Sequence, residues 1–223
     1  MQKERRYELK FVVAAKDKDE VFLWLYNSVG LFKKAHDDRR VNNIYFDHSN
    51  LSSLEDNLSG ISRRQKMRYR WYGNNVYPIG GYMEVKNKDN NLGWKNHYKV
   101  ENLHINEKDS WKEIISKITS NSEELQILSS QYFIPTLCNR YDRQYFESHD
   151  GKVRITIDLN IEFYQQNSLT NPNFTNKSYS DDLMIIECKF DEDSRKLAHS
   201  IIDKIPVRRS RYSKYASGAF CNY

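Results

Sequence analysis

The ten residues Arg64–Gly73, with the sequence RQKMRYRWYG, constrain the fold more than any other stretch. Positions 64, 66, 68 and 70 are all Lys or Arg, whereas Met67, Tyr69 and Trp71 fill the alternate places. A period of two is that of a β-strand, so one face carries only cations and the other large apolar side chains. The alternative is a strand with its charged face in water. However, like charges along one face repel each other, and solvated faces usually mix both signs. The pattern therefore favours a strand that presents its cations to a polyanion.

Other segments alternate in the same way. Pairs such as Glu8 with Lys10 and Glu187 with Lys189 share one face, opposite an apolar face. The pattern predicts further strands over 7–13, 41–47, 82–88, 95–99, 137–146, 152–158 and 183–190. Helical periodicity predicts helices over 17–34, 49–58, 111–128 with a break near Asn121, 193–205 and 210–220. A single open sheet with one wet face is an alternative that gives the same alternation.

The helices favour a closed sheet. If they pack on the apolar strand faces, the charged faces turn toward one another, and closure also removes exposed sheet edges. We therefore expect an α+β fold: a closed antiparallel β-barrel with helices packed outside and a cation-lined tunnel inside. Unpaired buried cations are too costly, so carboxylates and a bound anion must offset them.

The overall composition is that of a folded, polar protein with a modest net charge of +5 over 223 residues. No linker or internal repeat divides the chain, so we expect one domain over 1–223. Cys138, Cys188 and Cys221 are odd in number and widely spaced, which argues against a disulfide framework or a thiolate zinc site. The N-terminus lacks the apolar run of a signal peptide, and no stretch is long enough to span a bilayer. We expect a cytoplasmic location.

The charged faces suggest phosphate chemistry. Arg offers a planar fork that matches phosphate oxygens, and Lys adds a mobile point charge. Carboxylates are poor phosphate neighbours unless a divalent cation bridges them, and carboxylates with phosphate oxygens suit Mg²⁺ or Mn²⁺. The carboxylates that share strand faces with these cations are Glu8, Glu84, Asp158 and Glu187. P-loop, Rossmann, serine-hydrolase and zincin signatures are all missing from the sequence.

An ordered set of short motifs resembles the VTC domain, the catalytic domain of the vacuolar transporter chaperone polyphosphate polymerase. That domain belongs to the triphosphate tunnel metalloenzyme (CYTH-like) group. The motifs are YELK (7–10), IYFD (44–47), KMRYRWYG (66–73), MEVK (83–86), RYDR (140–143), VRITID (153–158), IECK (186–189) and SKY (213–215). Each motif alone is weak evidence for the resemblance, but the motifs occur in the family's order and span nearly the whole chain.

The resemblance implies an antiparallel tunnel that binds a nucleoside triphosphate and polyphosphate, with Lys214 on a C-terminal helix at one mouth. By position, it implies phosphate contacts from Lys10, Arg68, Arg70, Lys86, Lys95, Arg143, Arg154, Lys189 and Lys214. The alternation adds Arg64 and Lys66 to these phosphate-binding candidates. We expect catalysis to depend on Arg68, Arg70, Lys86, Arg154 and Glu187. Glu187 is the main candidate to hold Mn²⁺ or Mg²⁺, with Glu8, Glu84 and Asp158 as weaker ones.

The sequence also departs from the family pattern. His97 stands where the family often has Arg, which predicts a pH-dependent part of the site, and Arg211 stands where eukaryotic enzymes tend to carry Lys. The phosphate-sensing and membrane-spanning parts of the eukaryotic complex are absent, so association with a membrane partner stays open.

Three functions remain. The leading one is a metal-dependent transferase that moves the γ-phosphate of ATP onto a polyphosphate end. The second is a hydrolase of inorganic triphosphate or a nucleoside triphosphate on the same scaffold. The third is a non-catalytic polyphosphate-binding module, against which the retained Glu187 argues. We expect no nucleic-acid partner, because the interleaved aromatic residues lie on the opposite strand face from the cations.

Overall fold

A computed structural model describes residues 6–90, 92–130, 134–166 and 169–220. The strands are β1 (Arg6–Ala14), β2 (Lys33–Asp47), β3 (Arg63–Tyr72), β4 (Ile79–Asp89), β5 (Leu92–His104), β6 (Ile134–Glu147), β7 (Arg154–Gln165), β8 (Tyr179–Asp181) and β9 (Leu183–Phe190). The helices are α1 (Lys18–Tyr26), α2 (Ser52–Leu58), α3 (Trp111–Thr119), α4 (Glu123–Ser129), α5 (Arg195–Ile202) and α6 (Lys214–Phe220), with a 3₁₀ turn at Ala15–Asp17.

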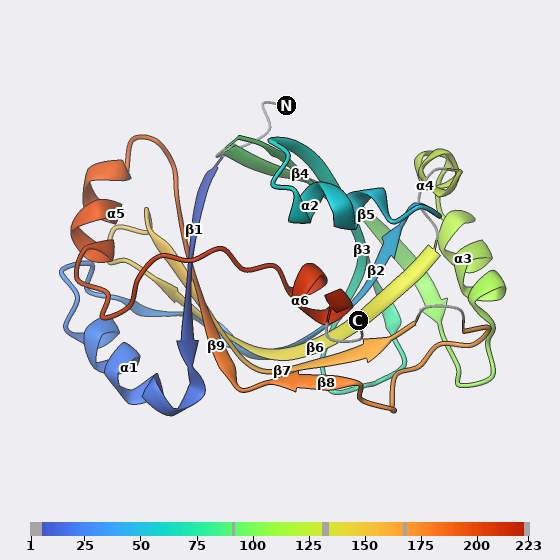
Figure 1. The fold of residues 1–223 in the computed structure, drawn as a ribbon, viewed down its shortest axis with the longest axis horizontal. Coiled ribbons are helices and arrows are strands. Elements are labelled where there is room, and N and C mark those ends of the chain that lie inside the picture. The colour runs from blue at the N-terminus through green and yellow to red at the C-terminus, as the bar shows by residue number, and fades with distance from the viewer. Residues whose placement is uncertain (1–5, 91, 131–133, 167–168, 221–223) are drawn as a thin grey trace.

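The strands form an antiparallel ring (Figure 1). Their order is β6-β2-β3-β4-β5-β1-β9-β7, and a pairing between β7 and β6 closes the circle, while β8 pairs with the C-terminal part of β7. The seam between β1 and β5 is the shortest, with Arg6 opposite Gly93 and Tyr7 opposite Leu92. The prediction of a closed antiparallel sheet with helices around it is therefore confirmed.

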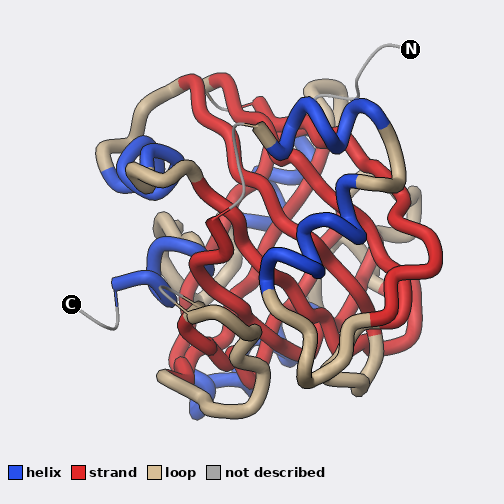
Figure 2. Tube along the Cα trace, turned by 90° about the vertical axis from the view of Figure 1, so that its right-hand side faces the viewer, coloured by secondary structure: helices blue, strands red, loops and turns tan. Residues whose placement is uncertain are grey.

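Most helices cover the outside of this ring (Figure 2). On one side, Trp111 and Ile114 of α3 pack in one apolar cluster with Met67, Tyr69 and Trp71, the alternate residues of β3. A capping box at Ser110 and Glu113 starts α3, and α4 begins after a break at 120–122, as the sequence predicts. On the other side, α1 and α5 cover the outer faces of β1, β7 and β9. Because the apolar strand faces are buried outside, the charged faces point into the ring.

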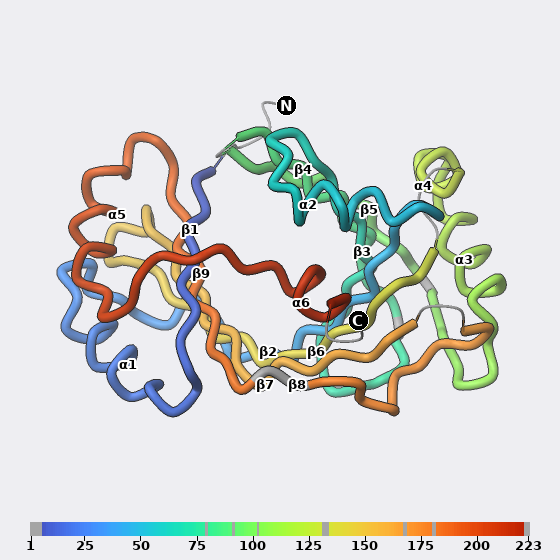
Figure 3. The backbone as a smooth tube through the Cα atoms, viewed as in Figure 1, coloured from blue at the N-terminus to red at the C-terminus, as the bar shows by residue number. Residues whose placement is uncertain are grey.

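Helix α6 lies differently, against the inner face of the ring at one mouth (Figures 1 and 3). Its Tyr215 stacks on Tyr45 of β2 with ring centroids 5.0 Å apart, and its hydroxyl donates a 2.5 Å hydrogen bond to Asp47. The inner faces of β2, β6 and β7 become apolar at this end, where Leu137 and Phe163 are fully buried under α6. The expected position of the C-terminal helix at one tunnel mouth is thus confirmed, and α6 packs there because this end of the tunnel wall is itself apolar.

Two local predictions were wrong. The helix expected over 17–34 ends at Tyr26, because Leu31 takes a left-handed backbone (φ 46°) and Lys33–Lys34 begin β2. The dipeptide Gly80–Gly81 predicts a turn before the strand over 82–88, but both glycines lie within β4, beside a register shift opposite β5. The short strand β8 falls in the polar loop, where the sequence pattern predicts none.

The contact of α6 with the ring leads to a stability prediction. A Cβ at Gly218 would lie 2.4 Å from Phe163 and 2.5 Å from Leu137, so Gly218→Ala overpacks this contact. We expect it to lower the free energy of unfolding by about 1–3 kcal/mol. The matched control is Gly93→Ala, whose Cβ meets only Asn87 O at an ordinary 3.5 Å. Equal stability of the two variants in urea unfolding would show that α6 is not packed as described.

Candidate functional site

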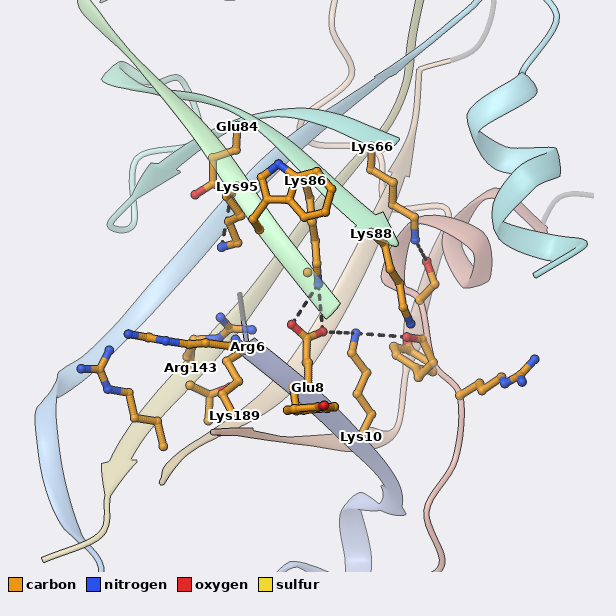
Figure 4. Close-up of a pocket in the computed structure, with 18 of the residues that line it drawn as sticks. Arg6, Glu8, Lys10, Lys66, Glu84, Lys86, Lys88, Lys95, Arg143 and Lys189 are labelled. Atoms are coloured by element: carbon orange, nitrogen blue, oxygen red, sulfur yellow. Dashed lines mark hydrogen bonds and ion pairs between the residues drawn. The ribbon is translucent and has the colours of Figure 1, made fainter. Parts of the chain in front are cut away.

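The ring encloses a cavity of about 1820 Å³. Its charged lining is dominated by cations, and Figure 4 shows many of them converging from different strands. The Lys and Arg residues of the lining are Arg6, Lys10, Arg39, Arg64, Lys66, Arg70, Lys86, Lys88, Lys95, Arg143, Arg154, Lys189, Arg209 and Arg211. The carboxylates of the lining are Glu8, Glu84 and Glu147. Such a surplus of positive charge within a concave surface attracts a polyanion.

Strand β3 gives the length of the cationic wall. The side chains of 64, 66, 68, 70 and 72 share one strand face, and this face points into the ring. At about 3.3 Å per residue, the eight steps from Arg64 to Tyr72 cover about 26 Å. Arg64 and Lys66 lie near the α6 mouth, because Lys66 donates a hydrogen bond of 2.9 Å to Ser213, the residue before α6. Tyr72 lies at the opposite end.

A first charge cluster joins β1, β4 and β9. Lys10 Nζ lies 3.1 Å from Glu187. Lys10 Nζ also lies 3.4 Å from Glu8, and Lys86 donates to both oxygens of Glu8 at 2.9 and 3.0 Å (Figure 4). Lys189 Nζ lies 3.0 Å from the other oxygen of Glu187. Burial opposes ionisation of Glu187, but Lys189 and Lys10 outweigh it and hold the pKa of Glu187 well below its usual range. Both carboxylates are therefore anionic at neutral pH.

A second cluster joins β6, β7 and α6. Arg143 donates two hydrogen bonds to the fully buried Asp158, at 2.5 and 2.7 Å, and Lys214 donates a third at 2.5 Å. Arg143 also approaches Glu187 at 3.6 Å, which links this cluster to the first. The rings of Tyr141 and Tyr212 lie near the Lys214 ammonium. Asp158 therefore holds Arg143 and the start of α6 in place.

A third cluster centres on Glu84 of β4. Arg68 donates to Glu84 Oε2 through Nε (2.7 Å) and Nη2 (2.5 Å), and Arg70 Nη1 lies 3.9 Å from the other oxygen. Arg70 is oriented by Asn43 at 2.8 Å and by Tyr141 at 3.0 Å. The half-exposed His97 lies 3.6 Å from Glu84. Burial lowers the pKa of His97, so Glu84 does not draw it into the charged form.

The α6 mouth carries cations without carboxylate partners. Among the described residues, Arg64, Lys66, Lys88 and Arg211 form no ion pair within 4 Å, and Arg211 lies beside Gly60 at the start of β3. Burial, together with the charges of Lys10, Lys86 and Arg64, lowers the pKa of Lys66 well below its ordinary value of 10.5. In the described part of the chain, the cations of this end of the tunnel thus lack ion-pair partners, whereas those of the central clusters are paired with carboxylates.

The structure brings the predicted site residues together in this ring. Lys10, Arg64, Lys66, Arg70, Lys86, Lys95, Arg143, Arg154 and Lys189 line the cavity, as do Glu8 and Glu84. Arg68, Asp158, Glu187 and Lys214 stand behind the lining and pair with residues of the three clusters. Arg154 differs from the others, because it is exposed at the end of β7 that lies beside Tyr145 and Glu147 of β6.

Sequence reasoning missed other lining residues. Lys88 follows Lys86 on the same strand face, and this alternation alone could have identified it as a lining residue. Arg39 belongs to the part of β2 that was predicted to be helix or loop, and Arg209 and Arg211 lie in the segment that crosses the ring from α5 to α6 (Figure 3). The aromatic residues also lie both outside and inside the ring, whereas the sequence predicted them on the strand face opposite the cations. Met67, Tyr69 and Trp71 do face outward, but Tyr72, Trp94, Tyr145 and Tyr212 line the cavity.

The oxygen ligands for a metal ion are few. No group of three His, Cys, Asp or Glu side chains within the described ranges could form a cage around an ion. Glu187 lies in register with Thr156, whose buried hydroxyl has no hydrogen-bond partner, and Glu8 shares Lys10 with Glu187. Mg²⁺ and Mn²⁺ often bind through one or two carboxylates and complete their shell with phosphate oxygens and water. Glu8 and Thr156 line the cavity and Glu187 lies in register with Thr156, so these three fit that kind of site, whereas Asp158 is fully buried between Arg143 and Lys214.

Two solved structures are similar in fold. A candidate adenylate cyclase from Vibrio parahaemolyticus aligns with a TM-score of 0.53 and 12% identity, over 95% of this chain and 96% of that chain. HpAC1 from Hippeastrum, a candidate adenylyl cyclase described as having a dominant triphosphatase activity, aligns with a TM-score of 0.50 and 14% identity, over 96% and 94%. At these identities the likeness concerns the fold, an antiparallel ring of the triphosphate tunnel (CYTH-like) type.

Within that class, the sequence itself gives the family. The sequence profile of the VTC domain matches residues 5–223, and the chain therefore belongs to the VTC domain family. No curated protein matches the sequence. Within the part of the chain that the structure describes, no helix is long and apolar enough to cross a membrane.

The lowered pKa of Lys66 leads to a prediction about anion binding. A bound anion favours the ammonium form and raises this pKa, so binding between the two pKa values takes up a proton, and affinity falls as pH rises. Sulfate does not titrate in this range, so calorimetric titration with sulfate in buffers of different ionisation enthalpy measures the uptake directly. We expect Lys66→Met to reduce it and Lys112→Met, on the outer helix α3, to leave it unchanged. Binding without proton uptake would mean that Lys66 is already charged in the free protein.

Proposed function

We propose that this VTC domain, as one unit over 1–223, is a divalent-metal-dependent phosphotransferase that acts on a triphosphate bound along the tunnel. The cationic face of β3, continuous from Arg64 to Arg70 and opposed by Lys10, Arg143 and Lys189, is the observation that carries the proposal. Its family membership and the triphosphatase activity named for a protein of similar fold support the same chemistry. The carboxylates Glu187 and Glu8 offer oxygen ligands for a divalent metal ion beside this cationic surface, which favours a catalytic role over binding alone.

The residues have distinct roles in this proposal. Arg70, Lys86, Arg143 and Arg154 bind and align the phosphate oxygens, and Arg68 holds Glu84 so that Arg70 keeps its orientation. Glu187 and Glu8 hold Mn²⁺ or Mg²⁺, which neutralises charge on the transferring group and the leaving oxygen when bound. Positioning and electrostatic stabilisation supply most of the catalysis in phosphoryl transfer. A ring of fixed cations with few competing anions provides both.

Transfer to a polyphosphate chain is the proposed reaction, with the ATP γ-phosphate as donor. The unpaired cations of the α6 mouth favour this transfer reaction. A triphosphate held at the central clusters does not also reach Arg64, Lys88 and Arg211. A longer polyanion contacts both regions at once. The alternative is hydrolysis of inorganic triphosphate or a nucleoside triphosphate, and it needs no such extension of the cationic surface.

The acceptor distinguishes these reactions. Incubation with ATP and Mn²⁺ is expected to produce acid-insoluble polymer together with ADP. Release of orthophosphate without polymer would identify a hydrolase. Binding of ATP with neither product would support the non-catalytic alternative.

A first substitution tests the metal assignment. We expect Glu187→Gln to lower turnover by at least about 100-fold while triphosphate binding persists, because the variant keeps the shape but loses the charge that holds a divalent ion. Glu147→Gln, at the rim of the cavity, is the control and should retain turnover. Full activity of Glu187→Gln in a range of Mn²⁺ concentrations would refute the assignment.

A second substitution tests the phosphate contacts. Arg154 is exposed at the cavity wall and forms no ion pair among the described residues, so Arg154→Ala removes a ligand contact without leaving a buried partner. We expect triphosphate binding to weaken by about 1–3 kcal/mol, as for other charged hydrogen bonds. Arg208→Ala, next to the cavity-lining Arg209 but outside the lining, should have no effect. Equal affinities of both variants in calorimetry would place the ligand elsewhere.

A further inference from the structure

The mouth opposite α6 has a surface of different chemistry from the rest of the tunnel. Tyr72 of β3, Tyr145 of β6, and Arg39 and His36 of β2 all line the cavity there. The Arg39 guanidinium lies 5.9 Å from the centre of the Tyr72 ring and 5.7 Å from that of Tyr145. His36 meets Tyr145 edge to face, with ring centroids 5.6 Å apart. These four residues form what we call the aromatic mouth.

The aromatic mouth continues the phosphate-binding wall. Tyr72 is the next inward-facing residue of β3 after Arg70, and Tyr145 is the next inward-facing residue of β6 after Arg143. Each step of two residues along a strand covers about 7 Å. A ligand whose phosphates contact Arg70 and Arg143 therefore has the rings of Tyr72 and Tyr145 one position beyond its last phosphate.

The rings of the aromatic mouth are accessible. Tyr72 is 43% exposed, Tyr145 is half-buried, and both lie at the end of the ring away from α6. Arg39 is exposed and forms no ion pair among the described residues. By contrast, Tyr69, Tyr141 and Tyr215 are almost fully buried and serve in packing. The contacts of Tyr72 and Tyr145 with Arg39 thus leave ring surface open toward the cavity.

We propose that the aromatic mouth binds the base of a nucleotide, so that the donor lies with its base between Tyr72, Tyr145 and Arg39 and its phosphates toward the central clusters. Bases stack on tyrosine rings and on guanidinium planes, because each offers a flat polarisable face. An inorganic triphosphate has no group to place there. The inference rests on the proposed function and deepens it: the site selects a nucleoside triphosphate, and the α6 mouth is left for a purely anionic chain.

The experiment compares two ligands that share the triphosphate and differ in the base. Binding of the β,γ-imido analogue of ATP and of inorganic tripolyphosphate is measured by calorimetry for each variant, in EDTA so that neither ligand turns over. We expect Tyr72→Ala with Tyr145→Ala to weaken the ATP analogue about tenfold. The affinity for tripolyphosphate should change less than twofold, so the ratio of the two affinities shifts.

Conservative variants separate stacking from a structural role. Tyr72→Phe should keep the wild-type ratio, and Tyr72→Trp should raise it, because the larger ring stacks more strongly. Tyr26→Ala, an exposed tyrosine on the outer helix α1, is the control and should leave the ratio unchanged. Because Tyr72 is exposed, we expect its single variants to fold. Their affinities can therefore be measured even if the double variant fails to fold.

Two results would overturn the inference, and they have different meanings. Equal weakening of both ligands, or an unchanged ratio in Tyr72→Ala and Tyr72→Trp, would show that the aromatic mouth does not contact the base, with the proposed function intact. Failure of the wild-type protein to bind either ligand would overturn the proposed function itself, and this inference with it.

Discussion

Charge compensation inside the ring is the constraint on which the rest of the structure depends. Cations from most strands of the ring face one enclosed space, and desolvating them without partners would cost several kcal/mol each. Glu8, Glu84, Asp158 and Glu187 offset that cost, each held by at least two cations from different strands or, for Asp158, from β6 and α6. Each of these carboxylates therefore fixes the positions of the cations around it and ties neighbouring strands together across the tunnel.

Charge compensation differs along the tunnel, so the two mouths of the tunnel are chemically different. The cations of the tunnel's centre are paired with carboxylates, and the mouth opposite α6 combines Arg39 with two tyrosines. At the α6 mouth, Arg64, Lys66 and Arg211 form no ion pair within 4 Å among the described residues. A tunnel with two unlike mouths can distinguish two ligands that both carry phosphates. Helix α6 contributes to the difference, because its apolar contact with the ring narrows one end while Lys214 connects it to Asp158.

Much of this arrangement follows from the sequence, because a period of two fixes which side chains share a strand face. The alternation in Arg64–Tyr72 correctly placed Met67, Tyr69 and Trp71 under α3 and their cationic neighbours inside the ring. The order of the motifs was enough to indicate the family. The ion-pair partners were not predictable from the sequence. The distance from Lys214 to Asp158 or from Lys86 to Glu8 depends on the register of the strands and on their tilt in the ring. The first half of β2 was missed because the polar run Lys33–Arg40 has no apolar face, and its pairing with β6 is irregular.

The central claim is that the cations of the ring converge on one phosphate chain. Its most direct test is a crystal structure of the protein with inorganic tripolyphosphate and Mn²⁺, with the manganese located by its anomalous scattering. The account predicts phosphate density within the ring, between Lys86 and Arg143, and the manganese peak next to Glu187. Tripolyphosphate bound on the outer surface of the ring, or manganese far from Glu187, would contradict it.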